Sequence, residues 1–233
     1  MADRKLTPER FARGMTFDEY VTYAGTPDNL KREGSMAPRK DFSGFLREAY
    51  DRARLTDDQV GAIRWLVAQP NGPRKILMLA EEWSSDCRRD LPMVARLAEV
   101  GGLDLGIFTR DGQKMGREPK ANPVESPNAD LMNQFLFERD GTTYQSIPIV
   151  AFYTKDLAYL YHYTEFPAIY HKDRVVGAIR APKSGESKEQ TTERGTRDFF
   201  ALQASPFFQV WACAGIDEML TKLHERLVVG SLA

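Results

Sequence analysis

Hydrophobic and polar residues change their periodicity sharply at one point in the first half of the chain, after residue 80. Residues 76–80 are all apolar and follow the turn-forming residues 70–73, a pattern that predicts a short buried strand. From Ser85 onward the apolar positions follow helical spacing, and they are Cys87, Leu91, Val94, Ala95 and Ala98. The pattern therefore predicts a strand that turns directly into a helix across residues 83–86.

The segments before this strand have helical patterns. Thr16-Phe17-Asp18-Glu19 is a capping box at the start of one helix, and Thr56-Asp57-Asp58-Gln59 caps another that runs up to the strand. An amphipathic pattern over residues 42–53 predicts a further helix between them. Residues 1–70 are thus expected to be helical.

The segments after the junction complete an α/β pattern. Residues 105–109 predict a strand that pairs in parallel through the crossover helix, and the polar residues 111–126 predict a long loop. A helix is expected from Ser126 to about Phe137, followed by two antiparallel strands, the second over residues 157–166. The charged residues 182–194 predict a flexible linker or an exposed helix, and Ser205-Pro206 opens a final helix. The expected fold is a mixed sheet of about four strands flanked by helices.

Composition and charge exclude several classes of function. The chain has 233 residues, 42% of them hydrophobic and 28% charged, with a net charge of −1. This balance gives no electrostatic reason to expect nucleic acid or an anionic membrane as a partner. The first ten residues lack the apolar core of a signal peptide, so a cytoplasmic location is the expectation. His and Cys residues are scattered, and phosphate loops and dinucleotide motifs are absent, so neither a metal nor a cofactor is expected.

Cys87 is the candidate for chemistry because it falls in the first turn of the predicted helix. The partial positive charge of a helix start lowers the pKa of a thiol, whereas the nearby carboxylates of Glu81, Glu82 and Asp86 raise it. Two interpretations remain open at this stage. Cys87 is either a reactive thiol or a small apolar side chain packed on the inner face of the helix.

Residues 80–92 resemble the active-site segment of the thioredoxin superfamily, Ala-Glu-Trp-Cys-x-x-Cys with a later proline. The matching positions are Ala80, Glu82, Trp83, Ser84, Cys87 and Pro92, with one extra glutamate at Glu81. Ile147-Pro148 resembles the family's second landmark, a dipeptide with a cis proline that opens a later strand. A Trp-Cys-x-Asp-Cys variant occurs in bacterial thioredoxin-like proteins, and residues 83–87 look like it with the first cysteine replaced by Ser84.

The resemblance covers about residues 56–165 and implies a fold, a domain division and a site. Residues 56–233 would form a thioredoxin-like domain with an enlarged C-terminal helical part, and residues 1–55 a helical extension that takes the place of the family's initial strand. In the family the first cysteine attacks a disulfide and the second resolves the mixed disulfide. Cys87, assisted by Ser84, is then the sole candidate redox thiol. The substrate-facing residues would be Trp83, Ser85, Asp86, Ile147 and Pro148.

Three hypotheses for the function follow from the resemblance. The first is a protein related to thiol–disulfide oxidoreductases whose partner is a protein or small-molecule thiol or disulfide. The second is a redox-inert module that binds peptides or proteins, and the third is a one-cysteine peroxidase that uses the Ser-x-x-Cys spacing of Ser84 and Cys87. An engineered Cys→Ser change at position 84 would have the same sequence, and the oligomeric state is not determined by any pattern in the chain.

Overall fold

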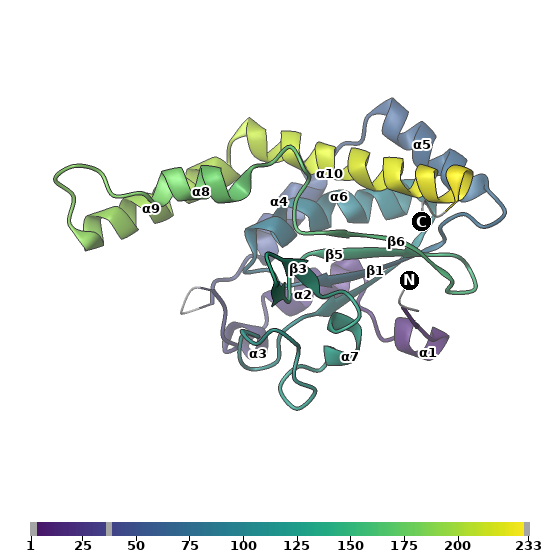
Figure 1. Ribbon diagram of the computed structural model, residues 1–233, viewed down its shortest axis with the longest axis horizontal. Coiled ribbons are helices and arrows are strands. Elements are labelled where there is room, and N and C mark those ends of the chain that lie inside the picture. The colour runs from purple at the N-terminus through teal and green to yellow at the C-terminus, as the bar shows by residue number, and fades with distance from the viewer. Residues whose placement is uncertain (1–3, 36–38, 231–233) are drawn as a thin grey trace.

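A mixed sheet of four strands forms the centre of the computed structural model, which describes residues 4–35 and 39–230 (Figure 1). The strands run in the order β2-β1-β5-β6, and their bounds are β1 Lys75–Ala80, β2 Asp104–Thr109, β5 Ile149–Tyr153 and β6 Tyr159–Thr164. β1 pairs in parallel with β2 and antiparallel with β5, and β5 pairs antiparallel with β6. The α/β class and the mixed sheet of four strands flanked by helices are therefore confirmed.

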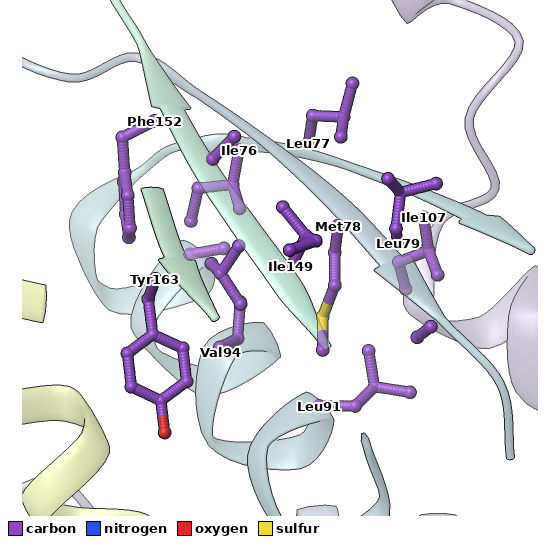
Figure 2. Packing of buried hydrophobic residues seen from close by; sticks show 14 of the residues in the cluster. Ile76, Leu77, Met78, Leu79, Leu91, Val94, Ile107, Ile149, Phe152 and Tyr163 are labelled. Carbon is purple, nitrogen blue, oxygen red and sulfur yellow. The ribbon is translucent and has the colours of Figure 1, made fainter. Parts of the chain in front are cut away.

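The strand β1 is central because it is buried on both faces. Its residues from Ile76 to Ala80 are fully buried, which explains why the segment is apolar without alternation. Figure 2 shows Met78 pointing toward the helix α6 (Ser85–Gly101), where Leu91 and Val94 lie, whereas Leu77 points away from α6. Both faces of β1 thus contribute to one hydrophobic core.

Helices cover the sheet on both sides. α6 packs against α4 (Ser43–Arg52), α5 (Asp57–Ala68) and α10 (Pro206–His224), and α10 continues into a π-helical turn, η1 (Glu225–Val229). On the other side, α2 (Phe17–Ala24) contacts β2, with α1 (Pro8–Phe11) and α3 (Pro27–Leu30) nearby (Figure 1). The three helices expected before β1 are all present. The capping boxes at Thr16 and Thr56 are confirmed.

The N-terminal residues share the core of the sheet. Tyr20 of α2 and Leu46 of α4 are both fully buried within the main hydrophobic cluster. Met15 forms a single antiparallel bridge with Ile107, in which each backbone N–H donates to the other residue's carbonyl, at 2.9 and 2.8 Å. The residues before β1 therefore pack onto the outer edge of β2 and supply a bridge there in place of a full strand.

The helix expected from Ser126 to Phe137 is much shorter in the structure. α7 spans only Ala129–Met132. The Ser126 hydroxyl donates a hydrogen bond of 2.6 Å to the carbonyl of Arg110, so it fixes the preceding loop and does not cap the helix. The sequence expectation of a longer helix was wrong: this tertiary contact takes the Ser126 hydroxyl from the local capping role, so the helix starts only after Asn128, and it ends at Met132.

A small hairpin follows α7 and was not expected. β3 (Phe137–Arg139) pairs antiparallel with β4 (Thr142–Tyr144), and the turn between them has positive φ at Asp140 (51°) and Gly141 (73°). Asp-Gly is a favoured sequence for a two-residue turn with both φ angles positive. The sequence signal was therefore present at residues 140–141.

Two helices near the C-terminus form a pair, here called the helical arm, that projects beyond the rest of the molecule (Figure 1). α8 spans Lys172–Arg180, and α9 spans Lys188–Gln203. Of the two alternatives for residues 182–194, the exposed helix is correct from Lys188 onward. Within the described part of the chain no single helix has the length and apolar character needed to cross a membrane, although α9 with α10 and η1 meets these criteria as a pair bent by 59°.

Substitution of two glycines tests how backbone conformation contributes to the stability of this fold. Gly102 ends α6 with φ of 61°, and Gly61 lies inside α5; an added Cβ would meet nothing within 4 Å at either site. We expect Gly102→Ala to lower the free energy of unfolding by about 1 kcal/mol, because an L-residue is strained at positive φ. Gly61→Ala should raise it by about 0.5–1 kcal/mol, because alanine favours the helix.

Chemical denaturation of the two variants and the parent protein measures both changes. Changes of the same sign would contradict the assignment of Gly102 to the left-handed end of α6.

Candidate functional site

The site lies where β1 turns into α6, and Ser84 stands at the helix start. Its side chain accepts a hydrogen bond from the backbone N–H of Cys87 at 3.5 Å, and Ser84 is 8% exposed. This is the ordinary role of a serine at an N-cap position. Ser84 thus stabilises α6.

The Cys87 thiol lies inside the protein, beneath the first turn of α6. The residue is 1% exposed, and its Sγ accepts a hydrogen bond from the backbone N–H of Glu81 at 3.5 Å. Burial raises the pKa of the Cys87 thiol to about 12, and the two hydrogen bonds from Glu81 and Ser84 only partly oppose this shift. The helix start and the carboxylates were the opposing effects visible in the sequence. Burial, the second interpretation left open by the sequence, is the largest effect on this pKa, and the carboxylates of Asp86 and Glu81 act in the same direction.

Two consecutive glutamates at the end of β1 are also buried and are neutralised by arginines from the N-terminal residues. Glu81 and Glu82 are 0% and 1% exposed. Arg32 donates to Glu81 at 2.8 Å, and Arg39 lies 3.1 Å from Glu81 and 2.9 Å from Glu82. We call these four residues the Glu–Arg network; its two positive and two negative charges balance.

Further groups add hydrogen bonds to the Glu–Arg network, although Arg39 Nε and Glu82 Oε2 have no partner among the described residues. Asn29 accepts from Arg32 at 2.8 Å and from Arg39 at 3.0 Å, and the backbone N–H of Asp111 donates to Glu81 at 2.7 Å. Burial raises the pKa of Glu81 to about 7, and Arg32 opposes that shift. Sequence reasoning missed this network. Its only visible signal was the pair of glutamates directly after a buried strand, since the arginines lie far away along the chain.

A second buried cluster surrounds Arg89, which lies near the start of α6. Arg89 donates to Asp86 at 2.7 Å and to Asp90 at 2.6 Å, and Lys172 of α8 also pairs with Asp86. Tyr163 of β6 donates to Asp90 at 3.3 Å. Burial raises the pKa of Asp90 to about 6, with Arg89 opposing the shift. Asp86, expected to face a substrate, is therefore 2% exposed and committed to two cations.

Two pockets open on either side of Ser84. The first, called the groove pocket, has a volume of about 280 Å³ and brings Trp83, Ser84, Asp86 and Ile147 together. The second, called the arm pocket, has a volume of about 290 Å³, lies against the helical arm, and is lined by Trp83, Ser84, Ser85 and Asp86 on the side of the motif. The expected substrate-facing residues are thus divided between two pockets.

The Ile147–Pro148 dipeptide and Trp83, the other parts of the family resemblance, are held in place by the fold. The Ile147–Pro148 peptide bond is cis, as the family resemblance implies, and both residues are buried. Pro148 does not line either pocket. The indole N–H of Trp83 donates to Asp111 at 3.1 Å, and the guanidinium of Arg110 lies 5.2 Å from the ring centroid. Trp83 is therefore fixed by hydrogen bonding and by a cation above its ring.

The base of the helical arm is attached to the first turn of α6. Lys172 of α8 pairs with Asp86, and Gln203 at the end of α9 accepts a hydrogen bond of 2.6 Å from Arg88. Both attachments lie beside Ser84. The residues of the arm thus form one wall of the arm pocket.

The described residues contain neither a metal-binding cluster nor a disulfide. Cys87 and Cys213 are both free thiols, and residues 4–35 and 39–230 hold no cluster of three His, Cys, Asp or Glu side chains that could bind a metal ion.

Comparison with known proteins gives likeness of fold alone. No family model and no curated protein matches the chain. The chain is similar to the crystal structure of PA1234, a protein of unknown function from Pseudomonas aeruginosa, with a TM-score of 0.53 and 15% identity over 94% of this chain and 98% of that one. It is also similar to an HIV epitope-scaffold, with a TM-score of 0.52 and 16% identity over the same shares.

Removal of one arginine tests the Glu–Arg network. Arg39→Met leaves Glu82 without its cation and Glu81 with one, so we expect the free energy of unfolding to fall by about 3–5 kcal/mol. Arg117→Gln is the matched control, because it breaks the solvent-exposed pair with Glu33, and its effect should be much smaller.

Urea denaturation of both variants compares the two losses. A loss for Arg39→Met no larger than for Arg117→Gln would show that the buried pairing does not hold the site together.

Proposed function

We propose that the chain is a thioredoxin-fold protein, related to thiol–disulfide oxidoreductases, that has lost redox chemistry and binds a ligand beside the former redox motif. The mixed four-stranded sheet, the strand-to-helix junction at Trp83–Cys87 and the cis bond before Pro148 support the kinship, because the resemblance implies each of them.

The burial of Cys87 is the observation that carries this proposal. In the related enzymes the residue at the position of Ser84 attacks first, and a serine hydroxyl cannot exchange disulfides. The thiol that remains is the one that acts second; it is 1% exposed, and its pKa is raised to about 12. A thiol must be ionised and accessible to attack a disulfide or a peroxide. The same burial therefore weighs against the one-cysteine peroxidase.

The pockets on either side of Ser84 support a binding role. Trp83 is shared by both pockets and is held rigidly by Asp111 and Arg110, so it offers a fixed aromatic surface to a ligand. The charges near the motif are used to join segments of the chain: Glu81 and Glu82 hold the N-terminal arginines, and Asp86 holds the arm. These contacts stabilise the walls of a binding site.

The accessibility of Cys87 is the direct test. At pH 8 in the folded protein, we expect iodoacetamide to label Cys213, which is partly exposed, and to leave Cys87 unmodified until denaturant is added. Peptide-resolved mass spectrometry distinguishes the two sites, so Cys213 serves as the internal control. Rapid labelling of Cys87 in the native protein would overturn the redox-inert proposal.

Restoration of the missing cysteine is a second test. Ser84→Cys recreates the two-cysteine spacing, but the new thiol would stand at a position that is 8% exposed, above the buried carboxylates of the Glu–Arg network. We expect the variant to remain inactive in the dithiothreitol-driven reduction of insulin, measured by turbidity. Catalytic reduction by Ser84→Cys would mean that the scaffold is still an oxidoreductase scaffold, with only one atom changed.

A further inference from the structure

The arm pocket differs from the groove pocket in the residues that close it. Its walls come from the first turn of α6, the start of α4 and the facing side chains of the helical arm, and its volume is about 290 Å³. Three phenylalanines line it, Phe42 before α4 and Phe199 and Phe200 on α9. These rings provide apolar surface from two different parts of the chain.

A cation lies over each of these three rings. The pairs are Lys40 with Phe200, Arg88 with Phe42 and Arg180 with Phe199, at 5.0, 3.9 and 5.2 Å from the charged group to the ring centroid. Among residues 4–35 and 39–230, no carboxylate forms an ion pair with any of the three cations. The pocket therefore has a surplus of positive charge over aromatic walls.

The other charged residues of the pocket do not cancel this surplus. Arg39 is neutralised by Glu81 and Glu82, and Lys172 shares Asp86 with Arg89. Asp86 is the one carboxylate that lines the pocket, and it already faces two cations. An incoming anion would therefore meet more positive than negative charge.

Arg88 is the cation with the strongest need for a counter-charge. It is 3% exposed, and it donates to two uncharged acceptors, the carbonyl of Glu82 at 2.7 Å and the side chain of Gln203 at 2.6 Å. Its Nε has no hydrogen-bond partner. Burial lowers the pKa of Arg88 to about 10, so the group is still charged at neutral pH. The carboxylates of Asp86 and Glu82 favour the charged form of Arg88 without forming an ion pair with it, and a bound anion would further reduce the cost of burying this charge.

The start of α6 adds to the attraction for an anion. Ser84 and Ser85 line the pocket at the N-terminus of this 17-residue helix, where backbone N–H groups lack helical acceptors and the helix dipole is positive. The cations and the N-terminus of α6 thus both attract an anion to the arm pocket.

We propose that the arm pocket binds a small organic anion, with its phosphate or carboxylate group near Arg88, Lys40, Arg180 and the start of α6 and with a flat apolar body against the phenylalanines. The inference rests on the proposed binding function and names the class of its ligand. A pocket of about 290 Å³ is at the lower end of the range for small-molecule sites, so it suits a ligand of one ring.

Phenyl phosphate is the first probe, with phenylacetate and inorganic phosphate as comparisons, and binding is measured by isothermal titration calorimetry. We expect saturable binding of phenyl phosphate or phenylacetate, which distinguishes the two acid groups, and weaker binding of inorganic phosphate because it lacks the apolar body. Arg180→Gln and Lys40→Gln should each weaken the binding by about tenfold, since each removes one charged contact.

Arg174→Gln is the matched control, because Arg174 lies on α8 like Arg180, is exposed, and does not line the pocket. It should leave the affinity unchanged. Lys40 and Arg180 are exposed, so their variants should keep the thermal unfolding temperature of the parent protein. Phe199→Leu should weaken the binding of phenyl phosphate and leave that of inorganic phosphate unchanged.

If neither aromatic probe showed saturable binding, the assignment would be overturned. Equal losses of affinity in Arg180→Gln and Arg174→Gln would overturn it as well. Binding of inorganic phosphate as tight as that of phenyl phosphate would overturn the role of the rings. None of these outcomes bears on the labelling of Cys87, so the ligand class can fail while the redox-inert proposal stands.

Discussion

The structure depends on the neutralisation of two carboxylates that the fold buries at the end of its central strand. Glu81 and Glu82 leave water completely, which is costly for a charged group unless a cation and hydrogen-bond donors compensate it. Arg32 and Arg39 provide that compensation, and both belong to the residues before β1. The N-terminal helices are therefore structurally inseparable from the site. The requirement to pair these charges fixes the path of the chain over the motif.

The same principle attaches the C-terminal half of the chain to the motif. Asp86 takes a cation from within α6 and another, Lys172, from the helical arm, while Arg88 holds the end of the arm through Gln203. Polar groups of the first turn of α6 thus hold the C-terminal arm, while Glu81 and Glu82, just before this helix, hold the N-terminal residues. Cys87 is enclosed beneath this turn, and the groove pocket and the arm pocket open beside it.

The charged residues therefore fall into two groups, those paired inside the protein and those that face the arm pocket. Inside, charges are balanced in the Glu–Arg network and nearly so around Arg89. In the arm pocket the balance is broken, because Lys40, Arg88 and Arg180 lie over rings and form no ion pair with the described carboxylates. Charge that is satisfied within the protein stabilises the fold, whereas charge left facing a cavity is available to a ligand.

Local patterns along the chain predicted the α/β class, the strand-to-helix junction, the central strand and the capped helices, because each depends on local periodicity and on side chains within one turn of each other. Ser84 and Cys87 could be located in this way, and so could the turn at Asp140-Gly141. The packed fold was needed to show whether Cys87 is accessible, which arginines reach Glu81, and that the Ser126 hydroxyl fixes the loop at Arg110 and does not start a helix. These depend on contacts between residues distant in the chain, 49 positions apart for Arg32 with Glu81 and 16 for Ser126 with Arg110. Burial and charge pairing are properties of the packed chain, and no local pattern encodes them.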